Sequence, residues 1–296
     1  MGNIALLCSW GGSFGNGHLQ RMASLLQYLN KKGLNPYLVT ERKDFPIRDF
    51  STFIEPEITE GTSLIIRDSR DSTSELIRSL RKTAPVVAVD DLGEGRSFAD
   101  CAVDLLPNLL FPYEQNEKPF IFGHSFSSAI KDLQTAQIMK EIDFCVYAGF
   151  GASPEYISFL QSLLPSGSRS VFFDGRTSFE SRMGESIPSK LSYPEAVLSS
   201  SNLISHFGIS LFEGALCGCS TFAINPTDYH SKLSDVAGPV LGTVNFGVYP
   251  DLDCDKVKNS LKEAGSIRKR SIVIAEVREG IELGLDLFYE RIKPFI

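Results

Sequence analysis

The chain has no long run of basic residues. Its 29 Lys and Arg are outnumbered by 36 Asp and Glu, which gives a formal net charge of −7 at pH 7. A protein that binds DNA or RNA usually gathers positive charge on one face. The composition therefore argues against nucleic acid as a partner, although a small anionic ligand needs only a local positive site.

The chain also lacks an apolar segment near the roughly 18 residues of a membrane helix. Its N-terminal apolar run, Ile4 to Cys8, is too short for a signal peptide and follows no basic residues. The six cysteines include no Cys-x-x-Cys pair, which is typical of reduced thiols, and the four histidines show no metal-ligand spacing. We predict a cytoplasmic protein with no transmembrane segment, no metal and no cofactor.

What the sequence does contain is a regular alternation of short apolar strands and helical periods. The first half has candidate strands at 4–8, 36–40, 64–66, 86–89, 101–106 and 120–122, and the second half has them at 143–148, 170–173, 203–205 and 221–224. This alternation predicts parallel sheets with helices on both faces, and its restart predicts a second, similar domain. We expect two Rossmann-like α/β domains, residues 1–135 and 136–296. In such sheets ligands bind at the carboxyl ends of the strands, so the loops of two facing domains could line one cleft.

A glycine-rich loop follows the first strand and reads Gly11-Gly12-Ser13-Phe14-Gly15-Asn16-Gly17-His18. Glycines let backbone N–H groups approach a ligand closely, and His18 falls where a helix N-terminus would direct positive potential. An imidazole held there is available as a neutral general base. The spacing matches neither the dinucleotide fingerprint nor a P-loop, which argues against a dehydrogenase or an NTPase. The plain alternative is a tight turn with His18 as an ordinary helix residue.

A second loop, His206-Phe207-Gly208-Ile209, precedes a helix expected to begin at about Ser210. The exposed N–H groups of a helix start form a ready cradle for phosphate, so a diphosphate could bind here without metal. Glu213 has two competing interpretations. It could close a capping box with Ser210, or it could accept the two hydroxyls of a ribose.

Carboxylates follow two further strands, at Asp68 and at Asp90-Asp91. Side chains at strand ends can act as bases or hold sugar hydroxyls, but Asp is also a common structural residue in loops and at helix starts. The structural interpretation is the more frequent one for each. His124 and His230 are most simply hydrogen-bonded loop residues, although His230 lies in a segment expected to face the cleft.

On these residues the chain resembles the UDP-sugar hydrolases of the pseudaminic-acid pathway and their relatives in spore-coat polysaccharide synthesis. More distantly it is similar to the glycosyltransferase that adds N-acetylglucosamine to lipid I. The family pattern Gly-x-Gly-His-x-x-Arg is intact from Gly15 to Arg21, the Asp-Asp strand end is matched by Asp90-Asp91, and the later loop with its Glu is matched by Gly208 to Glu213. The resemblance implies a GT-B architecture with UDP mainly on the C-terminal side.

The sequence also departs from that family at three places. A tyrosine after the third strand is replaced by Ser69 or Arg70, and Gly-Gly-x-Asp-Pro becomes the segment from Gly149 to Pro154. An Asn-Gln pair becomes Tyr229-His230. The base and the diphosphate loops survive while the sugar-contacting positions have changed, so we expect nucleotide-sugar chemistry on an altered sugar.

The resemblance and the loops together yield a set of expected site residues, with His18 as the catalytic base. Substrate contacts are expected from Gly15, Asn16, Gly17, Arg21, Asp68, Arg70, Asp91, Tyr229 and His230. Nucleotide contacts are expected from Gly149, Gly151, His206, Phe207, Gly208, Ile209, Ser210 and Glu213.

Three functions remain open from the sequence. The first is a metal-independent inverting hydrolase of a UDP-activated sugar in surface-glycan or nonulosonic-acid biosynthesis, in which His18 activates water. The second is an inverting GT-B glycosyltransferase in which His18 deprotonates an acceptor hydroxyl. The third is a nucleotide-sugar-binding protein that has lost catalysis.

Overall fold

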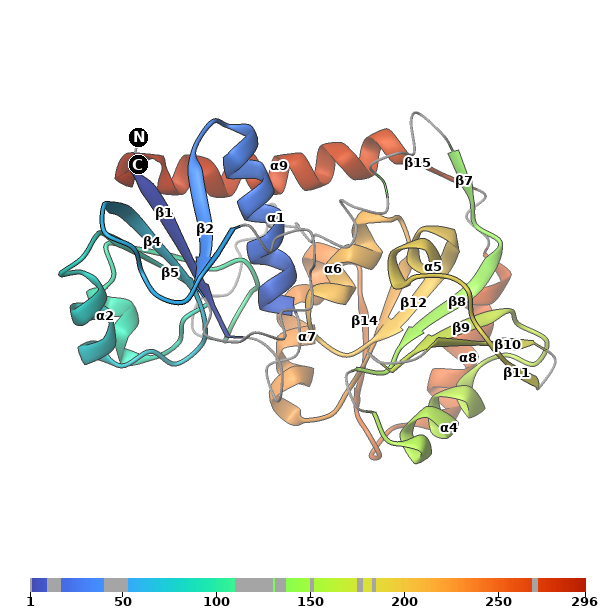
Figure 1. The fold of residues 1–296 in the computed structure, drawn as a ribbon. Coiled ribbons are helices and arrows are strands. Elements are labelled where there is room, and N and C mark those ends of the chain that lie inside the picture. The colour runs from blue at the N-terminus through green and yellow to red at the C-terminus, as the bar shows by residue number, and fades with distance from the viewer. Residues whose placement is uncertain are drawn as a thin grey trace. The chain divides into compact units, whose positions relative to one another are not determined.

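The computed structural model describes residues 2–9, 17–39, 53–109, 130, 137–149, 152–174, 178–182, 185–267 and 271–296. The chain divides into two compact units (Figure 1). The first unit holds the described residues up to Leu106 together with Ile281–Ile296, and the second holds those from Pro107 to Gly280. Each unit is built around its own sheet.

The sheet of the first unit has six parallel strands. They are β1 (Asn3–Cys8), β2 (Asn35–Val39), β3 (Ile54–Glu55), β4 (Thr62–Asp68), β5 (Val86–Val89) and β6 (Cys101–Val103). Their order is β3-β2-β1-β4-β5-β6, which is the order of a doubly wound sheet. The direction of winding reverses between β1 and β4, and in doubly wound sheets the carboxyl ends of the strands at such a point are the general location of ligand sites.

Helix α1 (Gly17–Lys31) follows β1 and buries the face that its apolar period predicts. Leu19, Met22 and Leu29 are fully buried, and the chain turns at Gly33, whose φ of +79° suits glycine. The other helical segments of this unit are α2 (Ser74–Leu80), the 3-10 turns η3 (Glu94–Phe98) and η4 (Lys293–Phe295), and the part of α9 (Ile274–Ile292) from Ile281 onward. Tyr28 of α1 donates a hydrogen bond to Asp286 of α9.

The sheet of the second unit has seven strands. They are β8 (Ile142–Tyr147), β9 (Ser170–Phe173), β10 (Ser178–Arg182), β11 (Glu185–Pro188), β12 (Ser200–Ser205), β13 (Ser220–Asn225) and β14 (Val244–Val248). The order β11-β10-β9-β8-β12-β13-β14 contains five parallel strands, with β10 and β11 added antiparallel at one edge. The winding of the parallel part reverses between β8 and β12. A separate antiparallel pair joins β7 (Gln137–Met139) to β15 (Ser271–Val273).

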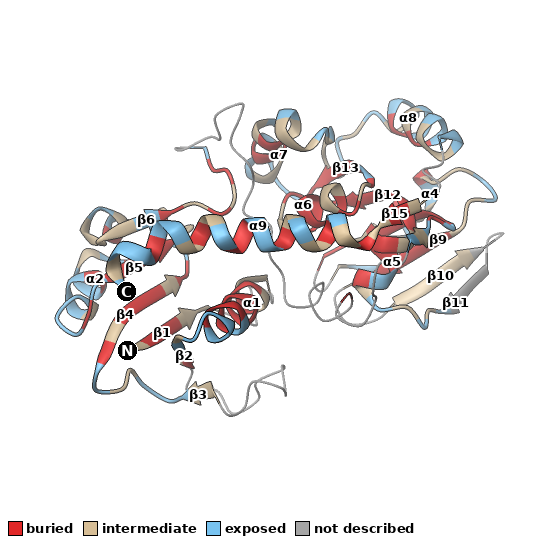
Figure 2. Ribbon diagram, turned by 90° about the horizontal axis from the view of Figure 1, so that it is seen from above, coloured by how far each residue is buried: buried red, intermediate tan, exposed pale blue. Residues whose placement is uncertain are grey.

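Five helices, with the part of α9 up to Gly280, complete the described part of the second unit. They are α4 (Pro154–Leu163), α5 (Tyr193–Ser199), α6 (Ile209–Leu216), α7 (Asp228–Leu241) and α8 (Cys254–Ser266). Phe144 of β8, Phe172 of β9 and Phe212 of α6 are among the largest fully buried side chains. Figure 2 shows that β12 is buried along its length, whereas β10, which lies next to the edge strand β11, is only half-buried.

The structure confirms the prediction of an α/β protein with two parallel sheets. All the strands expected from apolar runs within the described residues are present, with ends shifted by a few residues. The expected strand at 120–122 lies outside the described residues. The six cysteines are free thiols, of which Cys145, Cys217 and Cys219 are buried. Across the described ranges, no helix combines the length and apolar character required to cross a bilayer.

Candidate functional site

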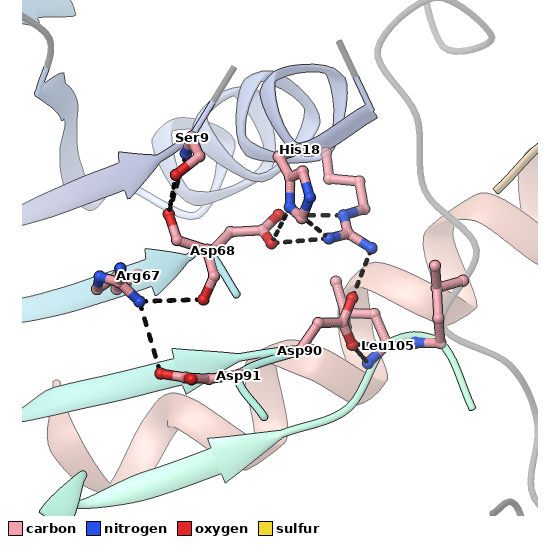
Figure 3. A network of polar contacts seen from close by, with 10 residues as sticks. Ser9, His18, Arg67, Asp68, Asp90, Asp91 and Leu105 are labelled. Carbon is pink, nitrogen blue, oxygen red and sulfur yellow. Dashed lines mark hydrogen bonds and ion pairs between the residues drawn. The ribbon is translucent and has the colours of Figure 1, made fainter. Parts of the chain in front are cut away.

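The candidate site of the first unit lies where the winding of its sheet reverses, at the carboxyl ends of β1 and β4. His18 lies in the first turn of α1, which follows β1, and Asp68 is the last residue of β4. Their side chains meet there, with His18 Nδ1 2.6 Å from Asp68 Oδ1 (Figure 3). The doubly wound topology thus joins two residues that are 50 positions apart in the sequence.

The environment of Asp68 identifies its charge state. Burial would raise the pKa of Asp68, but the Arg21 charge and the hydrogen bond from His18 outweigh burial and hold that pKa below its ordinary value. An ionised carboxylate can only accept hydrogen bonds, so the proton in the contact belongs to His18 Nδ1. This tautomer leaves Nε2 as the nitrogen of His18 able to take a proton.

Arg21 stands beside this pair on the same helix, three residues after His18. Its Nε and Nη2 donate to the two oxygens of Asp68 at 3.0 and 2.7 Å, and its Nη1 donates to Asp90 at 2.7 Å. The side chain is almost completely buried. The sequence placed Arg21 among the substrate-binding residues, whereas in the structure its described contacts are with carboxylates of its own chain. Two donors cannot bond to each other, so the 3.0 Å between Arg21 Nη2 and His18 Nδ1 reflects their shared acceptor, Asp68 Oδ1.

Asp90 joins the network although the expected site residues included only its neighbour Asp91. Asp90 follows β5 with a φ of +50°, a conformation that Asp adopts more readily than most residues. Its Oδ1 accepts from the backbone N–H groups of Leu105 and Leu106 at 2.7 and 3.2 Å. The sequence indicated the Asp90-Asp91 pair at the strand end, but it is the positive φ of Asp90 that determines which of the two carboxylates faces Arg21.

Asp91 is turned away from Arg21 and is fully buried. Its Oδ1 accepts from the backbone N–H groups of Ser72 and Gly93 at 3.0 and 2.9 Å, and its Oδ2 accepts from the Ser72 hydroxyl. These contacts connect the loops after β4 and β5 and account for the burial of Asp91 without a ligand. Arg70 is exposed in the loop after β4, and Gly17 opens α1. Gly15 and Asn16 lie outside the described residues.

The candidate site of the second unit also lies where the winding of its sheet reverses, at the carboxyl ends of β8 and β12. Gly208 is the N-cap of α6, and the loop before it is fixed because the Phe207 N–H donates to Asn225 at 2.9 Å. The N–H groups of Ile209 and Ser210 occupy the first turn of α6, where a helix has no partners of its own to offer them. This start of α6 is able to bind an anion.

Glu213 lies one turn further along α6 and is buried. Because the N-cap is Gly208, Ser210 is inside the helix, so the capping-box interpretation of Ser210 and Glu213 is wrong. Burial raises the pKa of Glu213 to about 8, and a hydrogen bond with Tyr193 opposes that rise. A buried neutral carboxyl can both donate and accept hydrogen bonds, which suits the hydroxyls of a sugar.

A ring cluster lies beside this helix start. Gly149 has a φ of +95°, and a Cβ at that position would lie 2.8 Å from His206 Nε2, so both the backbone and the space require glycine. His206 Nδ1 donates to the carbonyl of Phe207 at 2.8 Å, and burial lowers the pKa of His206. The rings of His206 and His230 are 6.0 Å apart, and the half-exposed Tyr229 packs against His230. Gly151 lies outside the described residues.

Comparison with known proteins identifies the fold. No protein-family model and no curated protein matches the chain. Among solved structures, the chain is similar to the glycotransferase of kitacinnamycin, with a TM-score of 0.62 and 10% identity over 98% of this chain and 99% of that one. It is also similar to UGT89C1 from Arabidopsis thaliana in complex with quercetin, with a TM-score of 0.56 and 15% identity over 95% and 93% of the two chains.

The fold is GT-B. A second structure of UGT89C1, in complex with UDP-L-rhamnose, matches with a TM-score of 0.50 and 13% identity over 99% of this chain and 97% of that one. The prediction of a GT-B-like α/β fold is therefore confirmed. Identities this low establish the fold alone, so what the chain does has to be argued from its own residues.

Proposed function

We propose that the protein is a glycosyltransferase that moves a sugar from a nucleotide-sugar donor to an acceptor hydroxyl, with His18 as the general base. The observation that carries the proposal is the 2.6 Å contact between His18 Nδ1 and the ionised Asp68. A histidine oriented in this way can remove a proton from a hydroxyl through Nε2 while the carboxylate stabilises the imidazolium that forms. General-base catalysis of this kind contributes roughly 10²–10⁴-fold to a rate.

The second unit is proposed to bind the nucleotide. The start of α6, with the N–H groups of Ile209 and Ser210, is assigned to the diphosphate, and Glu213 is assigned to the ribose hydroxyls. Departure of a nucleoside diphosphate places negative charge on the phosphate, which the partial positive charge of a helix start stabilises. The proposal therefore requires no metal or cofactor.

Transfer is favoured over hydrolysis by the solved structures that share the fold. One of them is a glycotransferase, and another binds UDP-L-rhamnose, a nucleotide-activated sugar. Hydrolysis of a UDP-sugar is the second candidate, because the segment Gly15 to Arg21 matches the hydrolase pattern and because the same base would activate water. In both reactions we expect inversion at the anomeric carbon. The third function, a nucleotide-sugar-binding protein that has lost catalysis, would be indicated by binding without any turnover.

The experiment is incubation of the purified protein with a panel of nucleotide-sugars, with and without acceptor alcohols, while nucleotide release is followed. Release that depends on an acceptor and yields a glycoside supports transfer. Release at the same rate in buffer alone, with free sugar as the product, supports hydrolysis instead. Nucleotide binding without release from any donor would contradict an enzymatic role.

A further inference from the structure

We infer that Asp90 is a positioning residue that acts on His18 through Arg21: it balances the charge of Arg21, so that Asp68 can stabilise a proton on the His18 ring. This inference rests on the proposed role of His18 as a general base. Asp90 has no described contact with His18, and its place in the network is visible only in three dimensions (Figure 3).

The first step of the argument is the position of the Arg21 charge. Arg21 Nη2 is 2.7 Å from Asp68 Oδ1 and 3.0 Å from His18 Nδ1, while Asp68 Oδ1 is 2.6 Å from the same nitrogen. A protonated His18 would therefore be repelled by Arg21 at almost the distance at which Asp68 attracts it. The pair of Arg21 and Asp68 is neutral as a whole, so by itself it would do little to hold a proton on His18.

Asp90 changes this balance because it is ionised. Its three described contacts are all donors: Arg21 Nη1 at 2.7 Å, and the backbone N–H groups of Leu105 and Leu106. A protonated carboxyl would need an acceptor for its own proton, and these contacts supply none. Burial and the nearby Asp68 charge hold the pKa of Asp90 above its ordinary value, while the Arg21 charge and the N–H groups of Leu105 and Leu106 oppose that rise. Asp68, Asp90 and Arg21 together then carry one net negative charge, which a proton on His18 would cancel.

Within the part of the chain that the structure describes, the other titratable groups near His18 leave this net charge unchanged. Cys8 on β1 has its thiol pKa raised by burial, so it is neutral. Arg67 on β4 acts on Asp68 through its charge, but it lies 3.5 Å from Asp91 Oδ2 and is balanced by that carboxylate. The groups that face His18 from α1, β1, β4 and the end of β5 thus leave Asp90 as the source of the extra negative charge.

The backbone around Asp90 suits this task. Its carboxylate is anchored by the N–H groups after β6, and it accepts from Arg21 Nη1, the guanidinium nitrogen that makes no described hydrogen bond to Asp68. Asn is the natural test substitution, because it keeps the shape of Asp and tolerates the φ of +50°. Asp90→Asn removes the charge and one of the two acceptor oxygens; with the amide oxygen kept on the N–H groups of Leu105 and Leu106, the amide NH2 replaces the carboxylate oxygen that accepts from Arg21 Nη1.

The test is an NMR titration of the His18 ring in the full-length protein without substrate, with the His18 signal assigned as the one missing from His18→Gln. Compared with the unsubstituted protein, the pH midpoint of the titration should move to lower pH in Asp90→Asn, by about half a unit or more. It should move to higher pH in Arg21→Gln, which removes the nearby cation. The double variant Arg21→Gln/Asp90→Asn should return close to the original midpoint, because both charges are gone.

Asp100→Asn is the matched control, since Asp100 is a carboxylate of the same unit that pairs with Arg81 and not with Arg21. Its midpoint should equal that of the unsubstituted protein. A midpoint that stays constant or rises in Asp90→Asn, in a protein with native circular dichroism, would overturn the inference. If Asp90→Asn does not fold, the absence of an upward movement in Arg21→Gln would overturn it instead. No turnover is measured, so a failure of the proposed function would appear in the donor assays and not here.

Discussion

His18 and Asp68 show how a single hydrogen bond assigns chemical roles to both residues. The Asp68 carboxylate is held ionised by Arg21 and can only accept hydrogen bonds, so His18 Nδ1 carries the proton of this contact. His18 Nε2 is then the nitrogen that can act as a base. Asp68 lies at the centre of the arrangement, because it contacts both the ring and the cation.

Replacement of Asp68 by Asn should therefore lower kcat by at least about a hundredfold, because the charge that stabilises the imidazolium is lost and the tautomer is no longer fixed. The KM for the donor should change little, since the assigned diphosphate and ribose contacts lie in the other unit. Steady-state kinetics with a donor identified from the panel would measure both constants. A kcat within about threefold of the unsubstituted enzyme would show that Asp68 does not support catalysis, and Asp100→Asn is the charge-matched control.

Glu213 gives a prediction about stability and pH. Its pKa is raised from an ordinary value of 4.5 to about 8 in the folded protein, so between these values the folded state retains a proton that the unfolded state releases. The contribution of Glu213 to the free energy of unfolding therefore falls as pH rises, by roughly 1.4 kcal/mol per pH unit within that window. Glu213→Gln removes the effect.

Urea unfolding of the unsubstituted protein and of Glu213→Gln, at pH 5 and at pH 8, measures the contribution of Glu213 to the free energy of unfolding. The stability of Glu213→Gln relative to the unsubstituted protein should rise by a few kcal/mol between the two pH values, in proportion to the window crossed. An equal difference at both pH values would show that the carboxyl of Glu213 is solvated or paired with a positive charge.

At the scale of elements, both candidate sites lie where the winding of a parallel sheet reverses. In the first unit the winding reverses between the neighbouring strands β1 and β4, and in the second unit it reverses between β8 and β12. Loops that leave neighbouring strands in opposite directions open a crevice there, which is the general location of ligand sites in doubly wound sheets.

The loop after β8 offers a matched pair of substitutions. Gly149 and Gly167 both have φ values near +80 to +95°, so Ala at either position is strained by the backbone. Only at Gly149 would the added Cβ also lie 2.8 Å from His206 Nε2, while nothing lies within 4 Å at Gly167. Gly149→Ala should therefore lower the free energy of unfolding by about 1 kcal/mol more than Gly167→Ala does. Equal losses in chemical denaturation would show that the ring of His206 moves aside at no cost.

The sequence predicted the buried strands well because they are continuous apolar runs. β5 and β9 were predicted with their observed ends. The strands β10 and β11 were missed, because they lie at the antiparallel edge of the sheet and the segment from Ser178 to Pro188 lacks an apolar run. β7 and β15 were missed because each has only three residues.

The candidate site was predictable only in part. His18 was identifiable from its glycine-rich loop, but its pairing with Asp68 depends on the adjacency of β1 and β4, which a single sequence does not specify. The place of Asp90 in the network depends on its positive φ, and the role of Arg21 depends on which carboxylates surround it. Local spacing therefore indicated the chemistry, while the partners followed from topology.

At the scale of the whole molecule, the described residues form two large sheets, each with its own candidate site, within a fold that matches solved structures over almost their full length. The proposed function divides the work between them. The first unit is assigned the base, and the second is assigned the nucleotide. A substitution at the base in the first unit should then affect turnover and leave nucleotide binding unchanged, whereas a substitution at the assigned nucleotide contacts in the second unit should affect nucleotide binding.

His18→Ala tests the central claim most directly, with turnover of the nucleotide-sugar and affinity for the free nucleotide measured on the same preparation. The account predicts that turnover falls by at least about a hundredfold while the Kd for the nucleotide stays within about twofold. A rate close to that of the unsubstituted protein would contradict the account, because the proton would then be removed by another group.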